Sequence, residues 1–108
     1  MSKFFILGTY SPESYEGFIK NPEQDRKALA QALAKAMGAE ITGMDFLRGS
    51  YDFIASIEAD SFEDLAAVKL TFEATKAGKM TILESVDINE IAKKAITAMD
   101  NYVPPASN

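Results

Sequence analysis

Apolar side chains recur along this chain with two different periods, and the period changes from one segment to the next. Residues 3–10 are apolar at odd and even positions alike, which is typical of a central strand that is covered on both faces. Residues 41–48 and 51–59 alternate bulky apolar side chains with a more polar set, and residues 79–86 form a further short apolar run. The pattern therefore predicts four strands.

Helical spacing of apolar residues predicts three long helices between and after these strands. The first covers 22–38 with Asn21 as its N-cap, and a short helical turn capped by Ser11 precedes it. The second covers 61–78 and the third covers 87–103, each with a capping residue that is followed three positions later by a carboxylate. The apolar stripe of the third helix consists of Ile88, Ile91, Ala95, Met99 and Tyr102.

The resulting order, β-α-β-β-α-β-α, is that of an α+β protein with a ferredoxin-like βαββαβ core and an added C-terminal helix. We expect strands one and three to be parallel in the middle of the sheet, strands two and four to form its edges, and both long helices to cover one face. Residues 1–103 form a single expected domain, and residues 104–108 form a short mobile tail.

The other face of this sheet carries apolar side chains of the central strands under either register of the hairpin. One register leaves Phe5, Leu7 and Ile54 bare, and the other leaves Phe4, Ile6 and Phe53 bare. Such a patch is larger than soluble monomers usually tolerate, so either the last helix or a second copy of the chain must cover it. We favour a second copy that packs sheet to sheet into a dimeric α/β barrel, because one helix covers only part of a four-stranded sheet.

The turn at Gly49-Ser50 sets the register between the second and third strands. A two-residue turn pairs Arg48 with Tyr51, whereas a three-residue loop pairs Arg48 with Asp52 and moves the second strand to the opposite face. The first register is favoured, because the second would force Tyr51 into the left-handed conformation. Under both registers, Arg48, Tyr51 and Asp52 gather at one end of the sheet.

Composition narrows the classes of function. Hydrophobic residues make up 47% and charged residues 25% of the 108 positions, as in an ordinary globular protein. Eleven Lys and Arg against sixteen Asp and Glu give a net charge of -5, which disfavours nucleic acids and anionic membranes as partners. Without Cys or His the chain forms no disulfide, no thiolate or imidazole zinc site, and no triad with an imidazole base.

No apolar run approaches the roughly 20 residues that a membrane span requires, and the run near the amino terminus is too short for a signal sequence. We therefore expect a cytoplasmic protein that uses no metal and no cofactor and binds neither membranes nor nucleic acid.

The residues around the central turn also resemble those of a known family. Gly49-Ser50-Tyr51-Asp52, between two predicted strands, is similar to the motif of the GYD-domain family, and the helices around Arg26 and from Phe62 follow in similar order. The resemblance covers roughly residues 3–95. The same motif resembles a hairpin in the effector-binding domain of Lrp/AsnC regulators, although no DNA-binding helix-turn-helix stands before the first strand. Both families belong to the dimeric α/β-barrel group, so the resemblance implies a ferredoxin-like subunit that forms a homodimer through its sheet.

Arg48, Tyr51 and Asp52 are the first candidates for binding a small polar or anionic ligand, because a guanidinium forks onto a carboxylate and a phenol adds one hydrogen bond. The structural alternative is that Asp52 caps the turn and pairs with Arg48, while the Tyr51 ring packs at the sheet edge. Tyr10 and Tyr15, which we expect near the other end of the sheet, are candidates to line a second pocket or simply to pack there.

Glu84 and Asp52 are the candidate catalytic bases. Glu84 has apolar neighbours in the sequence, a setting in which a carboxylate can act as a general base, although a solvated edge-strand glutamate is the commoner outcome. With strand one next to strand four, Lys3 is expected at the same end of the sheet as Glu84.

These features together predict a small homo-oligomeric protein that binds a small polar or anionic metabolite in a cleft of its barrel. The alternative is a cofactor-free isomerase or monooxygenase-like enzyme, in which Glu84 or Asp52 is the base and Tyr51 or Arg48 holds an enolate. A third reading is an interaction module whose exposed strands recruit other proteins.

Overall fold

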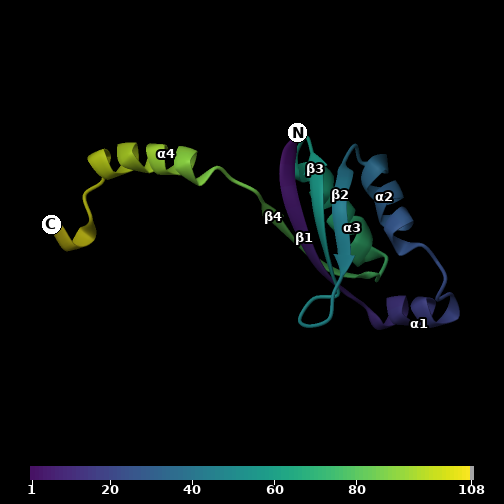
Figure 1. Ribbon diagram of the computed structural model, residues 1–108. Helices are drawn as coiled ribbons and strands as arrows, with labels where there is room; N and C mark the ends of the chain where they lie inside the picture. Colours follow the sequence, from purple (N-terminus) through teal and green to yellow (C-terminus); the bar gives the residue numbers. More distant parts are fainter. Residues whose placement is uncertain (108) are drawn as a thin grey trace.

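The first strand, β1 (Ser2–Tyr10), lies in the middle of a four-stranded antiparallel sheet with the order β2-β3-β1-β4 (Figure 1). The computed structural model describes residues 1–107. The other strands are β2 (Glu40–Phe46), β3 (Phe53–Ala59) and β4 (Gly78–Glu84). The central position predicted for the strand that is apolar on both faces is therefore confirmed.

Four α-helices accompany the sheet: α1 (Pro12–Lys20), α2 (Arg26–Ala36), α3 (Phe62–Ala74) and α4 (Ile88–Asn101). The long helices α2 and α3 cover one face, α1 lies at the end of the sheet where β1 finishes, and α4 stands away from the sheet (Figure 1). A short 3-10 turn, Pro105–Ser107, follows α4. The predicted α+β fold of ferredoxin-like topology with an added C-terminal helix is confirmed. None of the helices in residues 1–107 is both long and apolar enough to cross a membrane.

The expectation that strands one and three run parallel is wrong. β1 pairs antiparallel with β3, so that Ser2 lies opposite Ala59 and Gly8 lies opposite Phe53. The reason is topological: the crossover through α2 makes β1 and β2 parallel, and the hairpin then reverses the chain, so β3 must run opposite to β1. The end of β1 at Tyr10 therefore meets the start of β3, not its end.

Side chains of alternate residues on the two central strands form the core against α2 and α3. On β1 the inward residues include Phe4 and Ile6, and on β3 they include Phe53 and Ile57, all almost completely buried. The core cluster comprises Phe4, Ile6, Ala34, Ala39, Phe53, Ala55, Ile57, Ala59 and Leu65.

The opposite face of the sheet, which we call the open face, carries the remaining side chains of these strands. Its apolar members come from three strands, because Phe5 lies opposite Leu83 of β4 and Leu7 lies opposite Ile54 of β3. Neither α2 nor α3 reaches it (Figure 1). Lys3 borders this patch, with its Nζ 5.1 Å from the centroid of the Phe5 ring.

The hairpin follows the register that the two-residue turn favours. Phe46 lies opposite Phe53, the Leu47 N–H donates to the Asp52 carbonyl oxygen at 2.8 Å, and continuation of this register places Arg48 opposite Tyr51. The ladder of β2 and β3 ends at Phe46, so the tip is a wider loop than a two-residue turn.

Helix starts follow local side-chain chemistry, with one correction to the prediction. The first long helix begins after Asp25, whose carboxylate accepts the Ala28 N–H, and not after Asn21, which instead ends α1. Asp25 has the extended backbone conformation of an N-cap, whereas Asn21 caps the end of α1 and Pro22 lies in a turn. The predicted caps Ser61 and Asp87 both accept backbone N–H groups of the helices they precede.

The whole chain is elongated, because α4 does not pack back onto the sheet. The radius of gyration is 18.5 Å and the longest axis 64 Å, whereas a compact domain of this length has a radius of gyration of about 13 Å. The chain's own last helix therefore leaves the open face uncovered.

Gly8 allows a close approach in the core, since a Cβ at this position would overlap the Phe53 ring. Gly8→Ala should therefore lower the free energy of unfolding by about 1–3 kcal/mol. Gly17→Ala is the matched control: it lies in α1 with open space around its Cα, and should raise the free energy of unfolding by roughly 0.5–1 kcal/mol. Chemical denaturation measures both, and an unchanged midpoint for Gly8→Ala would contradict the packing described here.

Lys69 and Glu73 connect α3 to β4. The Lys69 Nζ donates to Glu73 Oε2 at 2.7 Å and to the Met80 carbonyl oxygen at 2.8 Å, and the Met80 N–H donates to Glu73 Oε2 at 3.2 Å. The hydrogen bond from Lys69, and after it the one from Met80, lower the pKa of the Glu73 carboxyl below its ordinary value.

A carboxylate with a lower pKa in the folded than in the unfolded chain stabilises the fold above the unfolded-state pKa, about 4.3 for Glu, and this contribution disappears as the pH falls through the folded-state pKa. Glu73→Gln should therefore reduce the free energy of unfolding near pH 7 and change it much less near pH 3. Glu23→Gln, in the exposed loop before α2, is the control and should have little effect at either pH. Urea denaturation at both pH values tests this, and an equal loss at both would refute the linkage.

Candidate functional site

The candidate site lies where β1 runs into α1 and the hairpin begins β3. There the Asp52 carboxylate accepts two hydrogen bonds through Oδ2, from the Tyr10 N–H at 2.8 Å and from the Tyr15 hydroxyl at 2.9 Å. Asp52 also donates its own N–H to the Gly8 carbonyl oxygen at 2.8 Å. The Asp52 carboxylate thus joins the hairpin to the end of β1 and to α1, at residues that lie 42 and 37 positions earlier in the sequence.

Both tyrosines have hydroxyls that hold their protons more firmly than usual. The hydrogen bond to Asp52 raises the pKa of Tyr15, because the carboxylate stabilises the protonated phenol. Burial raises the pKa of Tyr10, and the Asp52 charge adds to this while the nearby Arg26 cation opposes it. Both phenols, which are protonated at neutral pH even at the ordinary tyrosine pKa of about 10, keep their protons to higher pH.

Arg26, the first residue of α2, is held at the same end by backbone carbonyls. Its Nη1 donates to Gln24 O at 3.1 Å, and its Nη2 donates to Asn21 O at 2.9 Å. Its guanidinium carbon lies 4.1 Å from the centroid of the Phe18 ring, in the geometry of a cation–π contact. These contacts fix the loop between α1 and α2 and orient the guanidinium.

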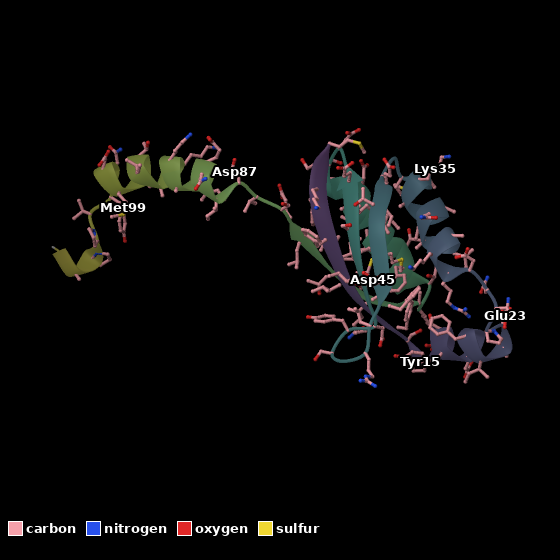
Figure 2. All side chains as sticks on the ribbon, viewed as in Figure 1. Tyr15, Glu23, Lys35, Asp45, Asp87 and Met99 are labelled. Carbon is pink, nitrogen blue, oxygen red and sulfur yellow. The ribbon has the colours of Figure 1, made fainter. Side chains whose placement is uncertain are left out.

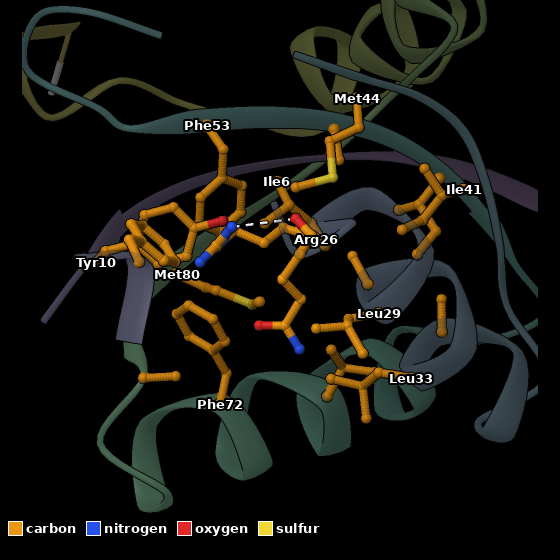
Figure 3. Close-up of a pocket in the computed structure, with 18 residues that line it drawn as sticks. Ile6, Tyr10, Arg26, Leu29, Leu33, Ile41, Met44, Phe53, Phe72 and Met80 are labelled. Atoms are coloured by element: carbon orange, nitrogen blue, oxygen red, sulfur yellow. Dashed lines mark hydrogen bonds between the residues drawn. The ribbon is translucent and has the colours of Figure 1, made fainter. Parts of the chain in front are cut away.

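A cavity of about 290 Å³ lies between α2, α3 and the inner face of the sheet. Figure 3 shows aromatic side chains around one end, Tyr10, Phe53 and Phe72, and aliphatic ones around the other, Leu29, Leu33 and Ile41. The Tyr10 and Phe53 ring centroids are 5.1 Å apart, and those of Phe53 and Phe72 are 5.8 Å apart. Arg26 and Gln24 supply polar groups to a lining that is otherwise almost wholly apolar.

A wider, more open hollow of about 640 Å³ adjoins the cavity on the side of α1. The two share Tyr10, Phe18, Gln24 and Arg26. Asp52, Tyr15 and Lys27 line only the outer hollow. The outer hollow therefore leads from solvent to the polar end of the cavity. Within residues 1–107, no group of three or more carboxylates is arranged to hold a metal ion.

The structure brings together two of the four predicted ligand-binding residues and leaves the other two apart. Tyr10 and Asp52 share a hydrogen bond, because the antiparallel pairing places them at the same end of the sheet and not at opposite ends as expected. Arg48 and Tyr51 are exposed at the hairpin tip and line neither hollow. Arg48 forms no ion pair with Asp52.

Glu84 lies at the other end of the sheet. It is exposed at the end of β4 and opposite Phe4, whereas Gly78, at the start of β4, lies opposite Tyr10. At 3.3 Å per residue this separates Glu84 from the Tyr10 end by roughly 20 Å. The Lys3 and Glu84 side chains lie at the same end but form no ion pair. Glu84 and Asp52 therefore cannot act together on one small substrate.

The prediction of site residues from the sequence did not include Arg26 or Gln24, and considered Tyr15 only as a packing or second-pocket residue. The sequence signal for Arg26 is its position directly after the Asp25 cap, where an arginine is unfavourable to the helix dipole unless it has another role. Tyr15 could be placed at the site only with the direction of β3 relative to β1 known, because that direction decides whether α1 lies near Asp52.

Comparison with known proteins adds three findings. The model of the GYD domain matches residues 4–95 of this chain. The chain is 26% identical, over 91 residues, to the glutamine synthetase and cystathionine beta-lyase binding protein of Thermus thermophilus, which corresponds to 84% of this chain and 95% of that protein. The structure of the present chain is similar to the crystal structure of a hypothetical protein from Pyrococcus horikoshii. The TM-score is 0.47 and the identity 19%, and the match covers 81% of this chain and 92% of that chain.

Asp52→Asn should lower the pKa of Tyr15 toward the ordinary tyrosine value of about 10, because the amide no longer carries the charge that stabilises the protonated phenol. Tyrosine-selective NMR followed against pH measures this for each ring separately. Asp45→Asn, on β2 and exposed, is the control and should leave Tyr15 unchanged. A Tyr15 titration that is identical in Asp52→Asn and in the unsubstituted protein would show that the hydrogen bond does not form in solution.

Proposed function

Because this chain belongs to the GYD domain family and encloses a cavity with a polar end, we propose that it is a homo-oligomeric protein that binds a small amphipathic anion. The apolar part of the ligand occupies the cavity between α2 and the sheet. Its anionic head group lies at the end formed by Arg26 and Tyr10, where the outer hollow opens to solvent.

The cavity is the observation that carries this proposal. Its volume of about 290 Å³ is close to the lower end of the range for ligand sites, about 300–1,000 Å³. An apolar wall with a few polar groups at one end is the usual composition of such sites. The volume suits a compact aromatic or branched aliphatic body better than a long chain.

Arg26 supports an anionic head group. A guanidinium has five N–H donors, and backbone carbonyls of Gly17, Asn21 and Gln24 account for three hydrogen bonds to Arg26. The remaining donors are free to bind a carboxylate, and the Phe18 ring against the guanidinium fixes its plane. Asp52 lines the outer hollow and not the cavity, so its charge disfavours an anion in the outer hollow.

The open face supports the homo-oligomer. Phe5, Leu7, Ile54 and Leu83 lie together on it, and neither α2 nor α3 covers them. A second copy that packs its sheet toward this one covers both open faces at once, since a two-fold axis brings identical patches together.

A protein partner is a second candidate function, and it has separate support. The similar Thermus thermophilus protein is named for binding two enzymes, and a binding role that uses an exposed surface of this chain is compatible with a ligand in the cavity. The enzyme alternative has less support. Glu84 lies at the end of the sheet opposite Tyr51 and Arg48 and lines neither hollow, and the Asp52 carboxylate is already hydrogen-bonded to Tyr10 and Tyr15.

Calorimetry on the full chain tests binding with pairs of ligands that have the same apolar part and differ only in the head group. An aromatic carboxylate and the corresponding alcohol form such a pair. Arg26→Met should weaken binding of the carboxylate roughly tenfold to a hundredfold, the effect expected for loss of a charge-assisted hydrogen bond, and should leave the alcohol nearly unchanged. Equal losses for both ligands would indicate a structural role of Arg26 and contradict an anion site. Lys27→Met, next to it in the outer hollow, is the charge-matched control.

Ala30→Phe tests the cavity itself, because Ala30 lines it and a phenylalanine side chain would occupy much of its volume. This change should abolish binding of both members of the ligand pair. Ala32→Phe, on the exposed side of α2, adds the same side chain outside the cavity and should bind both ligands normally. Undiminished binding by Ala30→Phe would place the ligand elsewhere.

A further inference from the structure

Helix α4 carries an apolar stripe that does not pack against the sheet or the helices α1, α2 and α3 in residues 1–107 (Figure 1). Its members, Ile88, Ile91, Ala95, Met99 and Tyr102, recur at helical spacing and are all exposed. Among the large side chains, the exposed fraction runs from 45% for Ile91 to 76% for Met99. Figure 2 shows Asp87 and Met99 at the two ends of this helix, both away from the sheet.

This helix is well defined locally and yet short. Asp87 caps it by accepting the N–H groups of Asn89 and Glu90, and Lys93 pairs with Glu90 at 2.9 Å. A helix of 14 residues is nevertheless marginal in water when it stands alone, since most helical stability in proteins comes from packing of an apolar face. The capping and the stripe therefore indicate a helix that packs against a surface in the assembled protein.

The linker before α4 directs the helix away from its own sheet. The Ser85 N–H donates to the Lys3 carbonyl oxygen at 2.9 Å, which continues the pairing of β4 with β1 by one residue. Only Val86 then remains before Asp87, whose φ of -91° and ψ of 101° are extended. No glycine is present to reverse the chain within this segment. To fold back over its own open face, α4 would need a different backbone conformation in this short linker, which is extended at Asp87.

We infer that α4 is an exchanged arm, which packs its apolar stripe on a second copy of this chain, along β4 at the margin of that copy's open face. This inference rests on the homo-oligomer of the proposed function, and it adds the contact by which α4 stabilises that oligomer. Under two-fold symmetry each copy gives its α4 and receives the partner's α4, so both bare surfaces are covered by the same contact.

The dimensions of the two surfaces agree. A helix of 14 residues is about 21 Å long at 1.5 Å per residue. Strand β4, with seven residues, is about 23 Å long. β4 is also an edge strand, and its exposed Leu83 lies on the open face beside Phe5. A helix along β4 would shield this edge and leave β1 and β3 of the two copies to pack against each other.

Substitutions on the two sides of α4 test the arm in the full chain. Ile91→Glu, on the apolar stripe, should raise the dissociation constant of the dimer roughly tenfold or more, measured by sedimentation equilibrium. Thr97→Glu, on the opposite side of the helix, makes the same change in charge and should leave the dissociation constant unchanged. A dimer that is equally strong in both variants would overturn the exchange while leaving the homo-oligomer intact, and a protein that is monomeric without substitution would overturn both.

Cross-linking identifies the surface on which α4 packs. Because the chain contains no cysteine, only the introduced cysteines can react. Met99→Cys and Leu83→Cys are made in separate chains, one of them with a mass tag, mixed under conditions of subunit exchange, and treated with a short bismaleimide. A covalent product of one tagged and one untagged chain is expected, and its yield should fall when Thr97→Cys replaces Met99→Cys. A chain that carries both Met99→Cys and Leu83→Cys completes the test at a concentration where the protein is dimeric: if it forms only an internal cross-link there, α4 folds back on its own sheet and the exchange is refuted.

Discussion

The need to cover both faces of β1 is the constraint on which the rest of this structure depends. The strand is apolar on both sides, and the two long helices shelter only the side of Phe4 and Ile6. The other side, with Phe5 and Leu7, remains in contact with water in a single chain. Because exposed apolar patches of this kind are unfavourable, the ferredoxin-like subunit is complete only when something else covers its sheet.

The face of the sheet that α2 and α3 cover contains the cavity. α2 begins after a loop that Arg26 holds in place through backbone carbonyls, and this arrangement leaves a cavity between the helix and the sheet. The hydrogen bonds that the Asp52 carboxylate accepts from Tyr10 and Tyr15 hold α1 at the neighbouring end of the sheet. The cavity therefore has one polar end, at which Arg26 and Asp52 are held by hydrogen bonds, and this arrangement is the basis of the proposed binding of an amphipathic anion.

Much of the fold could be predicted because it depends on local patterns. The strand periods, the caps at Ser61 and Asp87, and the two-sided hydrophobicity of β1 are all properties of short segments. The hairpin register agrees with the one predicted, although the tip is a wider loop than the two-residue turn on which the steric argument depends. The start of α2 was placed four residues too early, because Asn21 and Asp25 are both good caps and only the packing of α1 selects between them.

The residues of the site could be predicted only in part, since their proximity depends on strand direction. By itself the sequence determined which residues can form each element, that one face of the sheet would be bare, and that Cys and His chemistry is absent. Only the tertiary structure decided that Tyr10 meets Asp52, that Arg26 lies at the mouth of a cavity, and that α4 stands clear of the sheet. The physical reason is that hydrophobic periodicity describes the environment of each side chain but carries no information on which distant segment provides it.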